Sequence, residues 1–335
     1  MDAVLQLTTA PRVRRVAAAR RALFVATVAA CVPYLMLKAA WVFGSTVGMP
    51  QGSVLRGNDS GLVAVNVLTL VMDSVAIATA LALSRPWGLR LPAWLLAVPM
   101  WIATGLIGPL FIAYPLQEVI ALLHGGPTMA SSRVPFLDGW VFALVYTGFM
   151  VQGLTLGGLF ALHVRERWGQ LLRGRVADLP AASATRPAQR VIAVTAALLA
   201  VFPIAMHITW SCGSTVGLTA ARSANRGADE YVTEATMALF AMAAVVSVLT
   251  LAFRARRGTR LAVPLVLGWC GAGTTATWGG WTLLATLPGS DRNPVTRQAA
   301  PLMNMTYAVQ MAAGLLIVAV GAFVLAELAA ERSRT

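Results

Sequence analysis

The stretch WVFGSTVGMP, residues 41–50, recurs later in the chain as WSCGSTVGLT, residues 210–219. Each copy places Gly-Ser-Thr-Val-Gly three residues after a Trp, near the end of an apolar run. The copies lie about half the chain length apart, and other short matches accompany them in the same order. These pair Lys38 with His207, Arg56-Gly-Asn-Asp59 with Arg226-Gly-Ala-Asp229, and Gly88-Leu-Arg90-Leu91 with Gly258-Thr-Arg260-Leu261. We interpret this pattern as an internal duplication.

The composition predicts a membrane protein. Of the 335 residues, 58% are hydrophobic and only 12% are charged, whereas soluble domains carry about 25% charged residues. The apolar runs reach the length of about 20 residues that a membrane-spanning helix needs. We therefore predict an all-α, polytopic fold with eight transmembrane helices, at residues 22–43, 62–84, 92–114, 137–162, 190–211, 235–253, 261–286 and 304–328.

These spans divide into two parallel four-helix repeats. Because each half has an even number of spans, the halves share one orientation and are expected to be related by a pseudo-two-fold axis along the membrane normal. The Ala-, Pro- and Arg-rich segment between them is interpreted as a linker. The predicted parts are a basic N-terminus (1–21), the first half (22–164), the linker (165–189), the second half (190–328) and a tail (329–335).

The arginines predict the orientation. Most of the 26 Lys and Arg residues lie in the N-terminus, the tail and the loops after the second, fourth and sixth spans. The positive-inside rule therefore predicts a cell-membrane protein with both termini in the cytoplasm. The net charge of +13 is explained by this distribution. Nucleic-acid binding is not expected, because no basic stripe is interleaved with base-stacking aromatic residues. The cysteines, Cys31, Cys212 and Cys270, lack the spacing of a disulfide framework or a metal site.

Polar residues inside the spans are candidate functional residues, since ionisable groups in a membrane are costly. Three sets share the spacing i, i+3, i+7 and so make one helix face each: Lys38, Trp41 and Ser45; His207, Trp210 and Ser214; and Asn66, Thr69 and Asp73. Lys38 and Asp73 have two interpretations. They form either a buried pair that only fixes helix packing, or a proton donor, a relay or a substrate contact.

The predicted outer side carries further acids, including Asp59, Glu118, Asp229 and Glu234. Asp59 and Asp229 belong either to ordinary ion-paired loops or to a carboxylate pair across the pseudo-axis. Tryptophans fall within or near the spans at Trp41, Trp101, Trp140, Trp210, Trp278 and Trp281. They form either an interfacial belt or an aromatic cavity that stabilises a cation. The Gly-Ser-Thr-Val-Gly turns likewise either cap helices or line the mouth of such a cavity.

Several chemistries are excluded by missing motifs. The chain has no phosphate-binding loop, dinucleotide fingerprint or H-E-x-x-H motif, and its histidines are far apart. We therefore predict no cofactor and no metal. The remaining chemistry needs only a general acid and a shaped apolar cavity, as in the protonation-initiated cyclisation of an isoprenoid.

The segment YLMLKAAWVFGSTVG, residues 34–48, resembles multi-pass actinobacterial membrane proteins that are similar to the membrane-integral terpene cyclases of bacterial meroterpenoid and indole-terpenoid pathways. The resemblance covers the first helix of each half. It matches no catalytic motif of those cyclases to residues of this chain, so no catalytic residue is assigned from it. It implies an isomerase- or lyase-type enzyme whose partner is a prenylated lipophilic substrate in the lipid bilayer. The candidate catalytic residues are Asp73, Asp59, Glu118 and Asp229, and the candidate substrate-binding residues are Lys38, Trp41, Asn66, His207, Trp210, Trp278 and Trp281.

A second class of function fits the same pattern. Parallel repeats with buried charges also suit a transporter or exporter of a small lipophilic or cationic molecule. A third class is an accessory membrane subunit. The sequence does not predict the substrate or the oligomeric state. It does predict an asymmetric site weighted to the first half, because Asp73 aligns with Ala243.

Overall fold

The computed structural model describes residues 2–56, 60–124, 137–180, 183–224, 226–286 and 300–332. Within these ranges the regular structure is helical, and one isolated bridge joins Arg175 to Arg260. The α-helices are α1 (Asp2–Val42), α2 (Ser60–Ser84), α3 (Ala93–Ile107), α4 (Leu110–His124), α5 (Gly139–Trp168), α6 (Arg186–Ser211), α7 (Ala220–Ala224), α8 (Ala228–Phe253), α9 (Ala262–Thr286) and α10 (Pro301–Arg332). Short 3-10 turns are η1 (Val54–Arg56), η2 (Pro86–Arg90), η4 (Leu171–Arg173) and η5 (Val176–Asp178).

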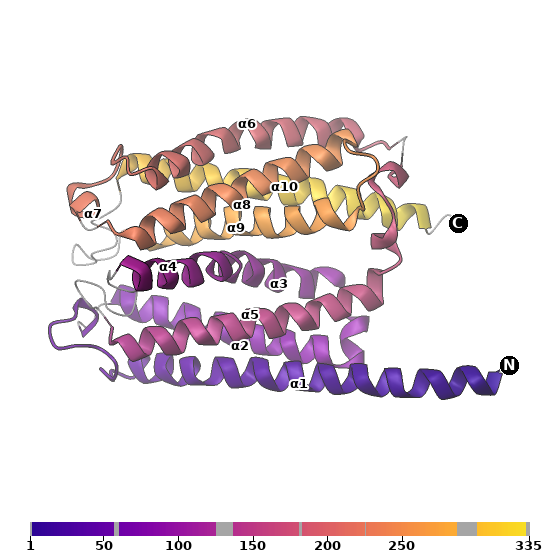
Figure 1. The fold of residues 1–335 in the computed structure, drawn as a ribbon, viewed down its shortest axis with the longest axis horizontal. Helices are drawn as coiled ribbons and strands as arrows, with labels where there is room; N and C mark the ends of the chain where they lie inside the picture. The colour runs from indigo at the N-terminus through magenta and orange to yellow at the C-terminus, as the bar shows by residue number, and fades with distance from the viewer. Residues whose placement is uncertain are drawn as a thin grey trace.

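The long helices run side by side along the longest axis of the molecule, and both ends of the chain lie at the same end of the bundle (Figure 1). Two groups of helices are visible. In the first, α1 packs against α2 and α5, and α3 contacts α2 and α5. In the second, α6 packs against α8 and α10, and α9 packs against the same two helices. The groups meet where α3 contacts α9 and α4 contacts α8.

In the part of the chain that the structure describes, seven helical segments are long and apolar enough to cross a membrane, which fits the predicted membrane-embedded protein. They are Arg14–Val42, Val63–Ser84, Ala93–Leu123, Gly139–Trp168, Arg186–Ser211, Ala228–Phe253 and Pro301–Glu331. The predicted span 261–286 forms α9, which is not one of these seven segments. Its residues 271–276 are all buried. A helix surrounded by other helices does not need an apolar surface, because it meets little lipid.

Some boundaries differ from the prediction. The predicted span 92–114 is two helices, α3 and α4, separated by Gly108 and Pro109. Proline has no amide hydrogen and favours the start of a new helix, so it accounts for the break. The helix α1 begins at Asp2 and continues through the basic segment that was predicted to precede the first span.

The predicted linker, 165–189, includes the end of α5, two 3-10 turns and the start of α6. Its middle is held against the loop between α8 and α9 by main-chain hydrogen bonds. Val176 N donates to Thr259 O at 3.0 Å, and Leu261 N donates to Gly174 O at 2.9 Å. These bonds position the connection between the two groups of helices.

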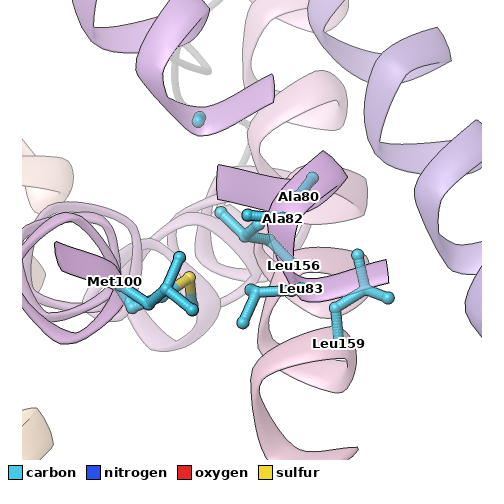
Figure 2. Close-up of a cluster of buried hydrophobic side chains, with 8 residues drawn as sticks. Ala80, Ala82, Leu83, Met100, Leu156 and Leu159 are labelled. Carbon is cyan, nitrogen blue, oxygen red and sulfur yellow. The ribbon is translucent and has the colours of Figure 1, made fainter. Parts of the chain in front are cut away.

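Each group of helices contributes a tryptophan to the core of the other. Figure 2 shows the core of the first group, where Ala80, Leu83, Met100, Leu156 and Leu159 of α2, α3 and α5 pack together. Trp269 of α9 packs against this cluster. Conversely, Trp101 of α3 packs against a cluster built from α6, α8, α9 and α10. The two tryptophans therefore extend across the boundary in opposite directions.

Glycines bring α3 and α9 into close contact beside these tryptophans. A Cβ atom added to Gly105 would lie 2.4 Å from the carbonyl carbon and oxygen of Gly273. A Cβ atom added to Gly273 would lie 3.3 Å from Gly105 Cα. Small residues that let two backbones approach are a common means of joining helices in membranes, where van der Waals packing provides much of the attraction.

The glycine contact predicts a specific loss of stability. We expect Gly105→Ala to destabilise the protein by about 1–3 kcal/mol, because the added methyl group forces α3 and α9 apart. Thermal unfolding in detergent measures this effect. The control is Gly157→Ala in α5, where an added Cβ meets no atom within 4 Å and stability should stay equal or rise slightly. Equal behaviour of the two variants would contradict the predicted contact.

Candidate functional site

The two Gly-Ser-Thr-Val-Gly turns adopt the same backbone conformation. The first glycines, Gly44 and Gly213, have φ angles of +87° and +96°, and the second glycines, Gly48 and Gly217, have φ angles of +75° and +74°. All four angles lie in the left-handed region that glycine tolerates and that commonly ends a helix. The turns therefore end α1 and α6 in the same way.

Equivalent side chains close both turns. Trp41 Nε1 donates to Val47 O at 2.8 Å, and Trp210 Nε1 donates to Val216 O at 2.9 Å. An arginine then binds main-chain carbonyl oxygens within each turn region: Arg56 Nη2 donates to Met49 O at 2.7 Å. Its counterpart, Arg226, donates from Nη1 to Ser214 O at 2.8 Å. The repeated tryptophans and arginines thus have a clear structural role in satisfying carbonyl groups.

A first polar cluster lies below the turn at the end of α1. Lys38 is 8% exposed, and its Nζ donates a hydrogen bond to Asn66 Oδ1 of α2 at 2.8 Å. The same Nζ lies 5.1 Å from the ring centroids of Tyr34 and Trp41. Two aromatic faces thus surround a positive charge, an arrangement that is favourable when water is excluded.

Asp73 lies deeper in the same cluster, in the middle of α2. It is 6% exposed, and Gln152 of α5 forms a hydrogen bond with its carboxyl group. Among the described residues, the oxygen Oδ2 has no hydrogen-bond partner. Lys38 is close enough to interact electrostatically with Asp73 but donates its hydrogen bond to Asn66. One oxygen of this buried carboxyl group is therefore left without a partner among the described residues.

A second polar cluster joins α6, α8 and α10 below the other turn. His207 Nδ1 lies 2.5 Å from Glu234 Oε2, and His207 Nε2 lies 2.7 Å from Gln310 Oε1. The other carboxylate oxygen, Glu234 Oε1, lies 3.8 Å from Arg222 Nη2. All three of His207, Glu234 and Gln310 are buried. The three side chains thus form one buried unit that joins α6, α8 and α10.

The structure brings some predicted site residues together and separates others. Lys38, Trp41, Asn66 and Asp73 belong to the first cluster, and His207 and Trp210 belong to the second, with their rings 5.7 Å apart. Asp59, and with it the predicted pairing with Asp229, lies outside the described residues.

The remaining predicted residues are on α4, α8 and α9. Asp229 is exposed in the first turn of α8, and Glu118 is half-buried on α4. The carbonyl oxygen of Asp229 accepts a hydrogen bond from Gln117 Nε2 at 2.8 Å. On α9, Trp278 Nε1 donates to Leu106 O at 3.2 Å, and Trp281 is half-buried.

Two residues of the clusters were not predicted from the sequence, Gln152 and Gln310. Both are amides in otherwise apolar helices, which is the signal that could have identified them. Their partners lie on other helices. Helical periodicity predicts the face of the helix on which a side chain lies, but it does not predict which other helix packs against that face. Glu234 was recognised as an acid near the outer side, but its contact with His207 was not.

Comparisons with protein-family models, with curated proteins and with solved structures found no match to this chain. Function must therefore be inferred from the two polar clusters. The first holds a cation between aromatic rings and a carboxyl group with an available oxygen. The second holds a histidine–carboxylate pair connected to an arginine.

The second cluster predicts unequal roles for two nearby acids. We expect Glu234→Ala to cost about 3–5 kcal/mol of stability, because it leaves His207 buried without its carboxylate partner. The side chain of Glu234 is 9% exposed, whereas that of Glu230, which also contacts Arg222, is 29% exposed. Glu230→Ala is therefore the control and should cost at most about 1 kcal/mol. Thermal or denaturant unfolding in detergent measures both, and equal losses would argue against the predicted difference.

Proposed function

We propose that the protein is a membrane-integral cyclase of a prenylated lipophilic substrate and that Asp73 is its proton donor. The observation that carries this proposal is the environment of Asp73. Its carboxyl group is buried halfway along an apolar helix, Gln152 orients it, and its Oδ2 has no partner among the residues described. A carboxyl group kept away from water stays in the neutral form that can donate a proton, and the proposed reaction begins with donation of a proton to an alkene or epoxide.

The proposed reaction needs no cofactor. The proton on Asp73 moves to a carbon of the substrate alkene, which leaves Asp73 as a carboxylate and creates a carbocation. A second double bond or a ring carbon of the substrate attacks this cation and closes a ring. The final cation then loses a proton to a base. One proton is gained and one is lost, so the product is a cyclic isomer of unchanged mass.

The aromatic residues near Asp73 suit a cationic intermediate. Tyr34 and Trp41 present their ring faces to the Lys38 ammonium group, which supports the ability of this region to stabilise positive charge. Lys38, Asn66 and Trp41 would orient the polar end of the substrate. The equivalent region of the second half contains His207, Trp210 and Glu234.

A second candidate function is supported by the second cluster. The buried His207–Glu234 pair, linked to Arg222 near the end of the bundle, resembles the proton-binding groups found in pumps and transporters. A proton-coupled transporter of a small lipophilic or cationic molecule would use protonation of this pair to drive a change between outward and inward states.

We also infer that the protein is a fused duplicate of two like-oriented four-helix units, with α1, α2, α3–α4 and α5 matching α6, α8, α9 and α10. The matched turns support this inference, as do the reciprocal tryptophans and glycines of α3 and α9, because a two-fold axis brings equivalent surfaces together. At the other end of the bundle, a polar contact joins the first and last helices of each unit. Arg20 of α1 binds Glu166 of α5, and Gln189 of α6 donates to Glu327 Oε1 of α10 at 2.6 Å. On this basis α9 completes eight spans in the cell membrane, with both termini cytoplasmic.

The cyclase proposal is tested by product analysis. Membranes containing the protein are incubated with prenylated indole or prenylated quinone substrates, and products are separated by liquid chromatography with mass detection. We expect a cyclic isomer of unchanged mass from the wild type and at least about 100-fold less from Asp73→Asn, because general acid catalysis contributes about 10²–10⁴-fold. The control is Glu331→Gln, an exposed acid near the end of α10, which should retain wild-type activity.

Two results would contradict the proposal. Unchanged product from Asp73→Asn, with the variant as stable as the wild type, would remove Asp73 as the acid. No isomer from the wild type, together with substrate-dependent proton movement in vesicles that His207→Asn abolishes, would establish the transporter instead.

A further inference from the structure

A groove at the end of the bundle that holds both termini has the chemistry of a lipid site. It has a volume of about 950 Å³ and lies between α1, the end of α2 and the end of α5. The arginines that line it are Arg20, Arg21, Arg85 and Arg165, and Glu166 is the acidic residue of its lining. A groove of this size is within the range of small-molecule sites, about 300–1,000 Å³.

The charge of the groove is strongly positive. Arg20 forms an ion pair with Glu166, so this carboxylate is already neutralised. Arg21, Arg85 and Arg165 are all exposed, and among the described residues no other acidic side chain lines the groove to offset them. Guanidinium groups bind phosphate oxygens with paired hydrogen bonds, so this arrangement favours a phosphate-bearing ligand.

Apart from Ser84, the remaining lining residues of the groove are apolar. Phe24 and Val25 of α1 and Leu162 of α5 continue from the arginines toward the middle of their spans. Val25 is 58% exposed. A ligand that fills the groove therefore needs an anionic head and an apolar tail that follows the helices, which free phosphate lacks.

The position along the membrane agrees with this chemistry. Arg21 lies within the first third of the span Arg14–Val42, Arg85 directly follows the span Val63–Ser84, and Arg165 lies near the end of the span Gly139–Trp168. Arginines near the ends of spans extend toward the headgroup region. Basic pockets between helices on the cytoplasmic side suit anionic headgroups, because that leaflet carries the anionic lipids.

We propose that this groove binds one anionic phospholipid, with its phosphate on Arg21, Arg85 and Arg165 and an acyl chain along Phe24, Val25 and Leu162. The site is independent of the reaction proposed for Asp73, which lies in the middle of α2. The lipid would tie α1, α2 and α5 together at the end where α1 extends beyond the bundle (Figure 1).

The experiment measures lipid binding to the intact protein in detergent. Native mass spectrometry counts bound phosphatidylglycerol and bound phosphatidylcholine, and thermal unfolding is followed with each lipid and with inorganic phosphate alone. The test variant is Arg21→Gln with Arg85→Gln. The control variant is Arg256→Gln with Arg257→Gln, which removes two exposed arginines from the α8–α9 loop, outside the groove.

We expect the wild type to retain one phosphatidylglycerol and to be stabilised by it more than by phosphatidylcholine. The groove variant should bind phosphatidylglycerol roughly thirtyfold more weakly, and the loop variant should match the wild type. Equal binding of both lipids, an equal loss in both variants, or equal stabilisation by inorganic phosphate would each overturn the proposal.

Discussion

Inside a membrane, each polar side chain must find a partner within the protein, because lipid offers none. The structure meets this constraint by pairing polar groups between helices. Lys38 of α1 reaches Asn66 of α2, Asp73 of α2 is held by Gln152 of α5, and His207 of α6 lies between Glu234 and Gln310. These polar contacts join α1 to α2, α2 to α5, and α6 to both α8 and α10, and so help to specify which helices become neighbours.

A different interaction joins the two groups. At the α3–α9 contact, glycines remove the side chains that would keep the backbones apart, and Trp101 and Trp269 fill the space on either side. This contact also explains the composition of α9, which is rich in Gly and Thr because other helices surround it. The two groups are thus joined by packing of small residues and tryptophans, whereas the helices within each group are joined by hydrogen bonds between polar side chains.

The sequence was sufficient for the parts of the structure that depend on local composition. Apolar runs predicted the seven segments that can span a membrane, since length and hydropathy are properties of each segment alone. The break between α3 and α4 was missed, although Gly108 and Pro109 signal it. The partners of Asp73 and His207 could not be predicted, because Gln152 and Gln310 lie on helices far away in the chain and only the three-dimensional packing brings them near. The position of Asp59 and its pairing with Asp229 stay predictions.

The central claim is that two like-oriented halves place both Gly-Ser-Thr-Val-Gly turns at one membrane face, opposite the termini. Labelling of intact cells with a membrane-impermeant maleimide tests it directly. Native Cys212 is exposed next to the second turn and can be labelled there. For the first turn, the labelled position is Thr46→Cys in a Cys212→Ser background. Arg256→Cys in the same background reports the opposite face. We predict labelling at 46 and 212 in intact cells and at 256 only after permeabilisation. Labelling that places positions 46 and 212 on different sides would contradict the account.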